Sequence, residues 1–370
     1  MFSRIVNTID GLKNFNLVNL SDYLQKEFNN KQIVIYGAGA FGREIFNLLS
    51  ANNINAKAFL DIKATGELFN IPVIHPSNYE NKTAIVILAI VLNKKTRKEI
   101  IEFLYKSGYK TIIDAQKIRA MYIELENEHI NEHTYEYFKT NQENILKPLD
   151  FLTDEESKKT YMQNVIAHIS RNYENTFETD EENQYLINSI PFKKGFSKFI
   201  DCGAYIGDTF LKLIEQNLMV QEYIGFEPDL DVFNRLSKNL STKKIKAMAF
   251  PAAVSDKMQI IKFNSKPGSG AINENGDISA ICVKLDDVLY NYEPSFIKMD
   301  IEGEEIKALN GAKNLILKSR PDLAICVYHY INHFWEIPNM LHDWNLGYKF
   351  YLRTHSSACM ETVLYAAGGD

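Results

Sequence analysis

The sequence has few of the features that mark nucleic-acid-binding, secreted or membrane proteins. Lys and Arg number 41 against 47 Asp and Glu, and the formal net charge of −6 excludes a strongly basic nucleic-acid-binding surface as the main feature. The longest apolar run, residues 84–92, is too short to span a bilayer, and the N-terminal residues lack the apolar segment and cleavage site of a signal peptide. We therefore expect a cytoplasmic protein without a membrane span.

Cysteine is also scarce. The four cysteines are far apart, include no CxxC pair and match no zinc motif, so we expect them to be buried, reduced thiols: Cys202, Cys282, Cys326 and Cys359. What remains is ordinary for a globular protein, with 45% hydrophobic and 24% charged residues. A chain of 370 residues has room for two or three domains, each with its own core.

The hydrophobic pattern divides the chain into three segments of an α/β protein. In most of residues 1–118, short apolar runs alternate with helical spacing, which predicts a small Rossmann-like domain. Residues 119–190 are rich in Glu, Asn and Lys and have helical spacing without a convincing strand, so we predict a helical connector. Residues 191–370 contain five strand candidates, and two closely spaced strands follow at 348–353 and 362–366. This last segment predicts a parallel sheet closed by an antiparallel pair.

The first of two glycine motifs follows a predicted strand and opens a helix. It has the GxGxxG pattern, in which Gly37 permits the tight turn, Gly39 lets a phosphate approach and Gly42 lets helix and strand pack closely. The helix N-terminus favours an anion, and Asp61 ends the next strand, near where a ribose-binding acid would lie. We interpret the motif as a nucleotide or sugar-nucleotide site. A turn kept only for packing, or a domain used for assembly, stays open as the alternative.

Residues 31–114 resemble the N-terminal domain of PglD-type sugar acyltransferases. The resemblance rests on the strand–GxGxxG–helix unit, the strand that ends in Asp61 and the segment Ile71-Pro-Val-Ile-His-Pro76. It implies a Rossmann-like domain that holds a nucleotide-linked sugar.

The second glycine motif, in Phe199-Ile-Asp-Cys-Gly-Ala-Tyr-Ile-Gly-Asp-Thr209, differs in chemistry from the first. No Lys follows, so it is not a P-loop, and a carboxylate at Asp201 would repel a pyrophosphate but suit a cationic amino group. The next strand ends in Glu227, which can accept both hydroxyls of a ribose. The third strand leads to Ala253 and Val254, against which an adenine ring could lie. Together these features predict S-adenosylmethionine as the ligand.

Residues 198–367 resemble the FkbM-type methyltransferases. The matching pieces are FIDCGAYIGDT, IGFEPD, AAVSD, VKLDDVL, FIKMDIEGEEIKALNGA and ETVLYA, although the first loop departs from the usual Val-Gly-Ala-Asn. The resemblance implies a Rossmann-like class I methyltransferase sheet and S-adenosylmethionine-dependent O-methylation of a sugar, either nucleotide-linked or part of a surface polysaccharide or glycan precursor. The cofactor-binding residues that we predict are Asp201, Gly203, Ala204, Tyr205, Gly207, Asp208, Thr209, Glu227, Pro228, Ala253, Val254, Ser255 and Asp300.

A sugar hydroxyl is a weak acid, so methyl transfer to it requires a general base, a metal ion or both. Asp300 and Glu302 close the fourth strand and His329 follows the fifth, so these three groups are candidates to bind one Mg²⁺. In the alternative, His329 is the base and Asp300 orients it. His355 precedes the final strand near the substrate side and is the fourth catalytic candidate.

Two competing functions stay open. An NAD-dependent sugar oxidoreductase or epimerase would use Gly37, Gly39 and Gly42, but it needs a Tyr-x-x-x-Lys or a catalytic Cys near that domain, and neither is present. The other competitor is a non-catalytic nucleotide-binding scaffold in a glycan pathway. We expect a sugar or nucleotide sugar as partner and no nucleic acid; a homo-oligomer is compatible with the sequence.

Overall fold

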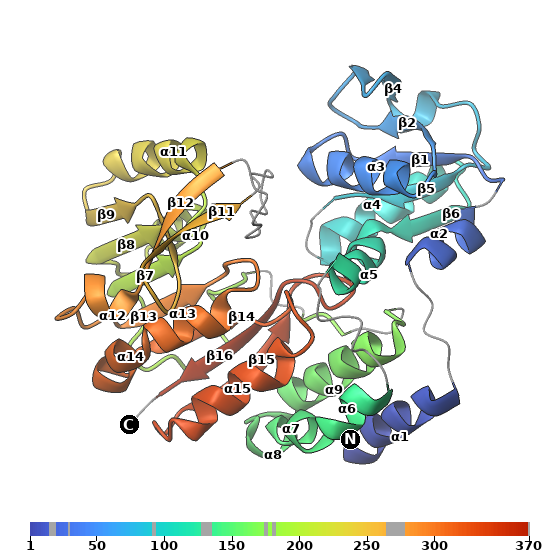
Figure 1. Ribbon diagram of the computed structural model, residues 1–370. Helices are drawn as coiled ribbons and strands as arrows, with labels where there is room; N and C mark the ends of the chain where they lie inside the picture. Colours follow the sequence, from blue (N-terminus) through green and yellow to red (C-terminus); the bar gives the residue numbers. More distant parts are fainter. Residues whose placement is uncertain are drawn as a thin grey trace.

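The computed structural model describes residues 1–14, 20–28, 30–90, 94–126, 135–173, 177–179, 183–263 and 278–368. Two α/β sheets, one in each half of the chain, are joined by a helical segment (Figure 1). The predicted α/β fold class is therefore confirmed. Within the described residues, each helix is too short or too polar to cross a membrane.

The N-terminal sheet has six strands in the order β3-β4-β2-β1-β5-β6, and all neighbours are parallel except β3 and β4. Buried apolar runs form its centre, as expected for parallel strands covered on both faces. The strands are β1 (Ile33–Tyr36), β2 (Ala56–Leu60), β3 (Gly66–Leu68), β4 (Ile71–Ile74), β5 (Ile85–Leu88) and β6 (Thr111–Asp114). Its helices are α2 (Leu20–Phe28), α3 (Ala40–Ala51), α4 (Lys94–Lys106) and α5 (Ala115–Glu126), whereas α1 (Phe2–Gly11) packs against the helices of the middle segment (Figure 1).

The middle of the chain is helical, as predicted, but its last helix is packed onto the C-terminal sheet. The helices are α6 (Tyr135–Thr140), α7 (Gln142–Leu146), α8 (Pro148–Phe151) and α9 (Glu155–Ser170). The α9 residue Ser157 accepts a hydrogen bond from the backbone of Leu352, and Asp154 pairs with Arg353 at 2.7 Å. The predicted boundary at residue 118 falls inside α5, and the domain limits remain a prediction.

The C-terminal sheet has seven strands in the order β15-β16-β14-β13-β7-β8-β9. Five are parallel, and the antiparallel pair at one edge has the predicted arrangement. The strands are β7 (Lys198–Cys202), β8 (Glu222–Phe226), β9 (Lys246–Phe250), β13 (Phe296–Met299), β14 (Asp322–Cys326), β15 (Lys349–Thr354) and β16 (Thr362–Ala367). The helices are α10 (Asp208–Glu215), α11 (Leu230–Ser241), α12 (Leu285–Val288), α13 (Glu305–Gly311), α14 (Lys313–Ser319) and α15 (His333–Asp343).

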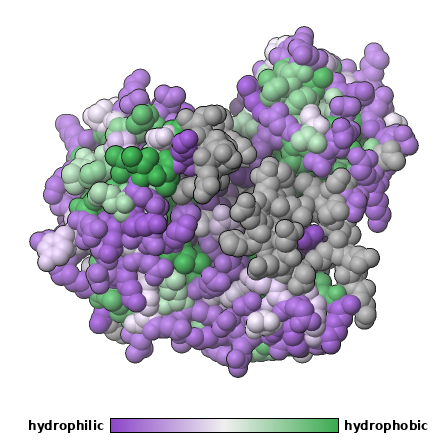
Figure 2. All heavy atoms as spheres, in the orientation of Figure 1, coloured by the Kyte–Doolittle hydropathy of each residue, from purple (hydrophilic) through white to green (hydrophobic). Residues whose placement is uncertain are grey.

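A small third sheet was not predicted from the sequence. It has the order β10-β12-β11 and consists of β10 (Ala252–Val254), β11 (Gln259–Phe263) and β12 (Ile278–Val283). Its exposed isoleucines Ile260 and Ile281 face each other across β11 and β12, in the region where Figure 2 shows a cluster of hydrophobic side chains beside α11. The segment Lys266-Pro-Gly-Ser-Gly270, whose Pro and Gly residues predict a loop between the third and fourth strands, lies outside the described residues.

Candidate active site

The carboxyl ends of β13 and β14 bring together three predicted catalytic residues. Asp300 and Glu302 follow β13, and His329 follows the neighbouring parallel strand β14. His329 Nε2 is 3.5 Å from Asp300 Oδ1 and 3.5 Å from Glu302 Oε2. Parallel strands end at the same edge of a sheet, which is why residues 27 or more positions apart meet here.

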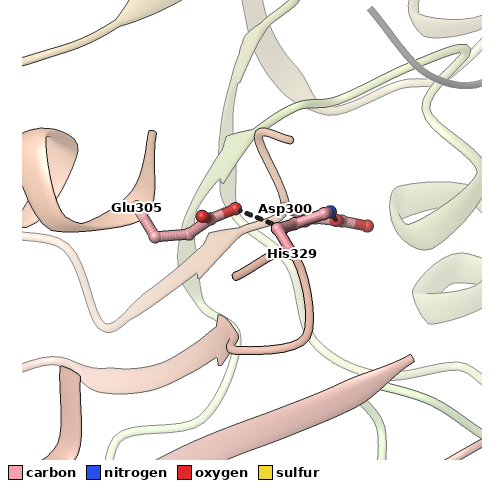
Figure 3. Close-up of side chains that lie close together, drawn as sticks. All are labelled: Asp300, Glu305 and His329. Atoms are coloured by element: carbon pink, nitrogen blue, oxygen red, sulfur yellow. Dashed lines mark ion pairs between the residues drawn. The ribbon is translucent and has the colours of Figure 1, made fainter. Parts of the chain in front are cut away.

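A fourth residue of this cluster, Glu305, was missed. Its Oε1 is 2.9 Å from His329 Nδ1 and accepts a hydrogen bond from the backbone of Ile301, and its Oε2 is 3.3 Å from His333 Nδ1. Figure 3 shows Glu305 and Asp300 on opposite sides of the His329 ring. Glu305 therefore contacts His329 through Nδ1, whereas Asp300 approaches it from the Nε2 side, and the orienting role of Asp300 stays a prediction.

The cluster shifts the pKa values of its members in opposite directions. Burial alone lowers the pKa of His329, but Glu305, Glu302 and Asp300 raise it to about 10. Burial raises the pKa of Glu302 to about 7, in spite of His329. Burial alone would raise the pKa of Glu305 as well, but His329 and His333 hold the pKa of this carboxyl well below its usual range. At neutral pH the imidazole of His329 is therefore protonated and Glu302 is close to its titration midpoint.

The turn that carries Glu302 has a strained backbone. Glu302 has φ +56° and Gly303 has φ +103°, both in the left-handed region. A Cβ on Gly303 would lie 2.4 Å from the ring of Tyr330. A non-glycine residue in this region costs free energy, so the packing around the turn holds Glu302 in this conformation.

Two residues that precede β7, Gln184 and Tyr185, contact carboxylates of the site. Nothing in the sequence marks them as site residues. The Tyr185 hydroxyl donates to Asp300 Oδ2 at 2.9 Å, and the Tyr328 hydroxyl lies 3.4 Å from Oδ1. Gln184 Nε2 donates to Glu361 Oε2 at 2.9 Å. Burial raises the pKa of Tyr185 most, and the charges of Asp300 and of Glu361, which comes from the β15–β16 hairpin, raise it further.

His355 lies on the same hairpin but differs from Glu361 in its contacts. Its Nε2 is 2.9 Å from the Tyr365 hydroxyl, and its backbone N–H donates to the Glu361 carbonyl. Its catalytic role stays a prediction.

The second glycine loop runs directly beside the cluster. Gly203 has φ +77°, and a Cβ there would lie 1.9 Å from the carbonyl oxygen of Asp300. Gly207 has φ +79° and precedes α10 as its N-cap, followed by the exposed Asp208 and the buried Thr209. The loop therefore approaches the end of β13 as closely as the backbone allows, which only glycine permits.

Glu227 follows β8, the neighbour of β7, and lies at the same carboxyl edge of the sheet. Its Oε2 accepts a hydrogen bond from the backbone of Tyr205 and its Oε1 from that of Asp229, both at 3.0 Å. Burial raises its pKa to about 7 against the effect of these hydrogen bonds. Since a carboxylate oxygen has two lone pairs, each oxygen can accept a second hydrogen bond from a ligand. Pro228, predicted beside it, is half-buried.

Asp201 lies just before the loop, near the end of β7, and its contact with the amino group of a cofactor stays a prediction. It lies inside β7 and is fully buried, with Oδ1 2.9 Å from Lys298 Nζ and Oδ2 accepting from the Tyr223 hydroxyl. Lys298 is its register partner on β13 and also donates to the carbonyl of Gly203 at 2.7 Å. Lys298 thus balances the charge of Asp201 and connects it to the loop at Gly203.

The residues predicted to contact an adenine ring differ in exposure. Val254 and Ser255 are buried, and Ala253 is half-buried on β10. Ala204 in the glycine loop is buried as well, whereas Tyr205 is exposed. Of the adenine candidates, Ala253 thus offers the most surface to a ligand. The contacts of all these residues with a cofactor stay a prediction.

The first glycine motif forms a tight turn in the N-terminal sheet. A Cβ on Gly42 would lie 1.9 Å from the carbonyl oxygen of Gly37, whereas no heavy atom lies within 4 Å of one on Gly39. Asp61 Oδ2 accepts from the backbone of Ala38 at 3.0 Å. Asp61 therefore holds the loop in place, and the space above Gly39, the N-cap of α3, is open for a ligand.

The two sheets, with a glycine loop at the carboxyl end of a strand in each, define a protein with two Rossmann-like domains. Residues 201–350 match the family model of the Methyltransferase FkbM domain, and residues 32–104 match that of the PglD N-terminal domain. Both resemblances drawn from the sequence are thereby confirmed.

Solved structures agree on the fold. The crystal structure of Methyltransferase FkbM from Methylobacillus flagellatus KT has a TM-score of 0.64 and 20% identity, with 98% of each chain covered. A structure of LepI in complex with SAM has 11% identity, covers 97% of this chain and 81% of that chain, and has a TM-score of 0.29, too low to inform the comparison. Comparison with curated proteins gives no significant match.

Proposed function

We propose that the protein is an S-adenosylmethionine-dependent O-methyltransferase that acts on a sugar hydroxyl. The observation that carries the proposal is the position of the Asp300–Glu302–His329 cluster directly beside the glycine loop, with Gly203 packed on the Asp300 carbonyl. The match of residues 201–350 to the Methyltransferase FkbM domain supports the same activity.

The cofactor in this proposal lies along the carboxyl ends of β7, β8 and β10. Glu227 accepts the ribose hydroxyls with the lone pairs that its backbone partners leave, and Ala253 contacts the adenine. The glycine loop approaches the methionine part, so the transferred methyl points toward Asp300. The alternative of NAD chemistry at Gly39 has no catalytic group to support it among the described residues of that sheet.

The reaction is an in-line displacement. The bond between the sulfonium sulfur and the methyl carbon breaks, a bond from the sugar oxygen to that carbon forms, and S-adenosylhomocysteine leaves as a neutral thioether. The hydroxyl proton passes to Glu302, whose pKa of about 7 suits a base at neutral pH. His329 already holds its proton, so it acts as the cation that orients Asp300 and Glu302.

Mg²⁺ is the competing occupant of this cluster. Asp300, Glu305 and His329 each offer one oxygen or nitrogen atom, and these atoms lie within 4.8 Å of one another. With Glu305 on Nδ1, the Nε2 of His329 would be the ligand together with Asp300 and Glu302, and the ion would lower the pKa of a bound hydroxyl. The proposal predicts that dialysis against a chelator leaves activity intact; loss that Mg²⁺ restores would assign these groups to the ion.

The experiment that tests the function measures transfer of a labelled methyl group from S-adenosylmethionine to a panel of sugars and nucleotide sugars. In Glu302→Gln, we expect the rate to fall about 100-fold or more, since the base is lost, and the affinity for S-adenosylhomocysteine to be unchanged. Glu304→Gln is the matched control, because Glu304 lies on the same turn but its carboxylate pairs with Lys307 at 2.9 Å. Equal rates in the wild type and Glu302→Gln would contradict the assignment.

A further inference from the structure

Tyr185 lies in the segment before β7, yet its hydroxyl reaches the carboxyl end of β13. The hydroxyl donates a hydrogen bond to Asp300 Oδ2 at 2.9 Å. Tyr185 is 6% exposed, whereas the side chain of Asp300 is 25% exposed. A ligand can therefore contact Asp300, while Tyr185 is covered by protein and acts on a ligand only through its neighbours.

The hydrogen bonds around Tyr185 have a definite direction. Gln184 Nε2 donates to the Tyr185 oxygen and to Glu361 Oε2, both at 2.9 Å. An amide nitrogen only donates, so the Tyr185 oxygen accepts there and keeps its single proton for one acceptor. The two candidate acceptors are Asp300 Oδ2 at 2.9 Å and Cys326 Sγ at 3.3 Å. The charged carboxylate is the stronger acceptor, so the proton of Tyr185 is directed to Asp300.

The contacts of Asp300 fix the orientation of its carboxylate. Tyr185 holds Oδ2, the Tyr328 hydroxyl donates to Oδ1 at 3.4 Å, and His329 Nε2 is 3.5 Å from Oδ1. The backbone carbonyl of the same aspartate lies against the glycine loop at Gly203. Tyr185 makes the shortest of the three side-chain contacts. It therefore contributes most to holding the carboxylate beside the loop, where we place the methyl group.

The cluster around this carboxylate has more acidic than cationic side chains. Asp300 and Glu302 are each 3.5 Å from His329 Nε2, and Glu305 is 2.9 Å from Nδ1. His329 holds its proton, because its pKa is raised to about 10, and it balances one of the three acids. Even when Glu302 is protonated, these four groups therefore have a net negative charge. A negative cluster favours a cation, and S-adenosylmethionine carries a positive charge on its sulfonium sulfur, whereas S-adenosylhomocysteine has a neutral sulfur.

We propose that Tyr185 is a positioning residue, which holds the Asp300 carboxylate toward the sulfonium group so that its charge favours binding of S-adenosylmethionine over S-adenosylhomocysteine. The inference rests on the proposed function and adds how the site distinguishes the cofactor from its product. Once the methyl group has been transferred, the sulfur is neutral and the attraction to Asp300 is lost, which helps the product to dissociate.

The ratio of the two affinities tests the inference without an acceptor sugar. Calorimetric titrations measure binding of S-adenosylmethionine and S-adenosylhomocysteine to the wild type, Tyr185→Phe, Asp300→Asn and the double variant, after chemical denaturation has shown that each is folded. Tyr348→Phe is the matched control. Tyr348 is also buried, but its hydroxyl donates to the carbonyl of Pro321 at 2.7 Å, at the opposite end of β14.

We expect Tyr185→Phe to weaken binding of S-adenosylmethionine about 3- to 10-fold and to change the affinity for S-adenosylhomocysteine by less than about 2-fold, because only the first compound has the sulfonium charge. Asp300→Asn should reduce the preference at least as much, and adding Tyr185→Phe to it should have no further effect. Tyr348→Phe should keep the wild-type ratio. A purely structural role of Tyr185 would weaken binding of both compounds equally.

An unchanged ratio in Tyr185→Phe or in Asp300→Asn would overturn the inference. A further fall of the ratio in the double variant would also overturn it, because Tyr185 would then act independently of Asp300. Failure of the wild type to bind either compound would instead overturn the proposed function. Since binding to the wild type is measured first and separately, the two failures are distinguishable.

Discussion

At the scale of single residues, the carboxylates at the strand ends differ in what surrounds them. Asp201 has a buried lysine partner, whereas Glu227 has only backbone donors. Burial raises the pKa of Asp201 against the effect of Lys298, and it raises the pKa of Glu227 to about 7, where the oxygens keep lone pairs. For these two acids, which look alike in the sequence, we therefore propose different roles: Asp201 supports the loop and Glu227 binds the cofactor.

The raised pKa of Glu227 predicts a pH dependence of cofactor binding. Ribose hydroxyls donate hydrogen bonds to the ionised carboxylate, so protonation opposes binding, and the affinity for S-adenosylhomocysteine should fall as pH drops below about 7. Glu227→Gln should bind more weakly, with a loss of about 2–4 kcal/mol, and lose this pH dependence. Calorimetric titrations between pH 6 and 8 check both effects.

Glu222→Gln is the control for this prediction, because Glu222 lies on the same strand and pairs with Lys246 on the surface. It should behave as the wild type does. A pH-independent affinity in the wild type would show that Glu227 does not touch the ribose.

At the scale of elements, the order of strands could be predicted only in part. Apolar runs that end at Asp201, Glu227 and Asp300 indicate parallel strands with a common functional edge, and the structure has that edge. The small sheet was missed because its strands are short and half-exposed. Glu305 was missed because nothing in the sequence of a helix start shows that its side chain will turn back to an imidazole on the next strand.

The glycine loop approaches β13 so closely that we expect Gly203→Ala to lose stability and cofactor affinity. An L-residue at φ +77° costs about 1–2 kcal/mol, and in addition its Cβ would overlap the carbonyl oxygen of Asp300. Gly195→Ala is the matched control, since Gly195 has φ +60° but no heavy atom within 4 Å of the added Cβ.

We expect Gly203→Ala to lower the free energy of unfolding by more than Gly195→Ala does, and to weaken binding of S-adenosylhomocysteine. Chemical denaturation and calorimetry measure the two effects. Equal losses in both variants would show that the end of β13 yields to the added methyl group.

At the scale of the whole molecule, charged contacts connect the two sheets. Arg97 on α4 pairs with Glu178, and the neighbouring Thr179 donates its backbone N–H to the carbonyl of Thr354 on β15. The sequence predicted the two domains and their glycine motifs, but nothing in it indicated a role for Arg97, because its partner Glu178 is distant in the chain.

Each sheet carries a different part of the proposed function. The C-terminal sheet carries the proposed methyl-transfer groups, and the N-terminal sheet carries the first glycine motif. No heavy atom lies within 4 Å of a Cβ added at Gly39, and binding of a nucleotide-linked sugar there stays a prediction. A substrate that binds to both sheets would therefore contact residues from both halves of the chain.

The central claim is that the loop between Gly203 and Gly207 binds S-adenosylmethionine. The most direct measurement is calorimetric titration of the purified protein with S-adenosylmethionine, S-adenosylhomocysteine and NAD⁺ in parallel. The account predicts binding of the first two and no binding of NAD⁺. Binding of NAD⁺ alone would contradict it and would move the chemistry to the N-terminal glycine motif.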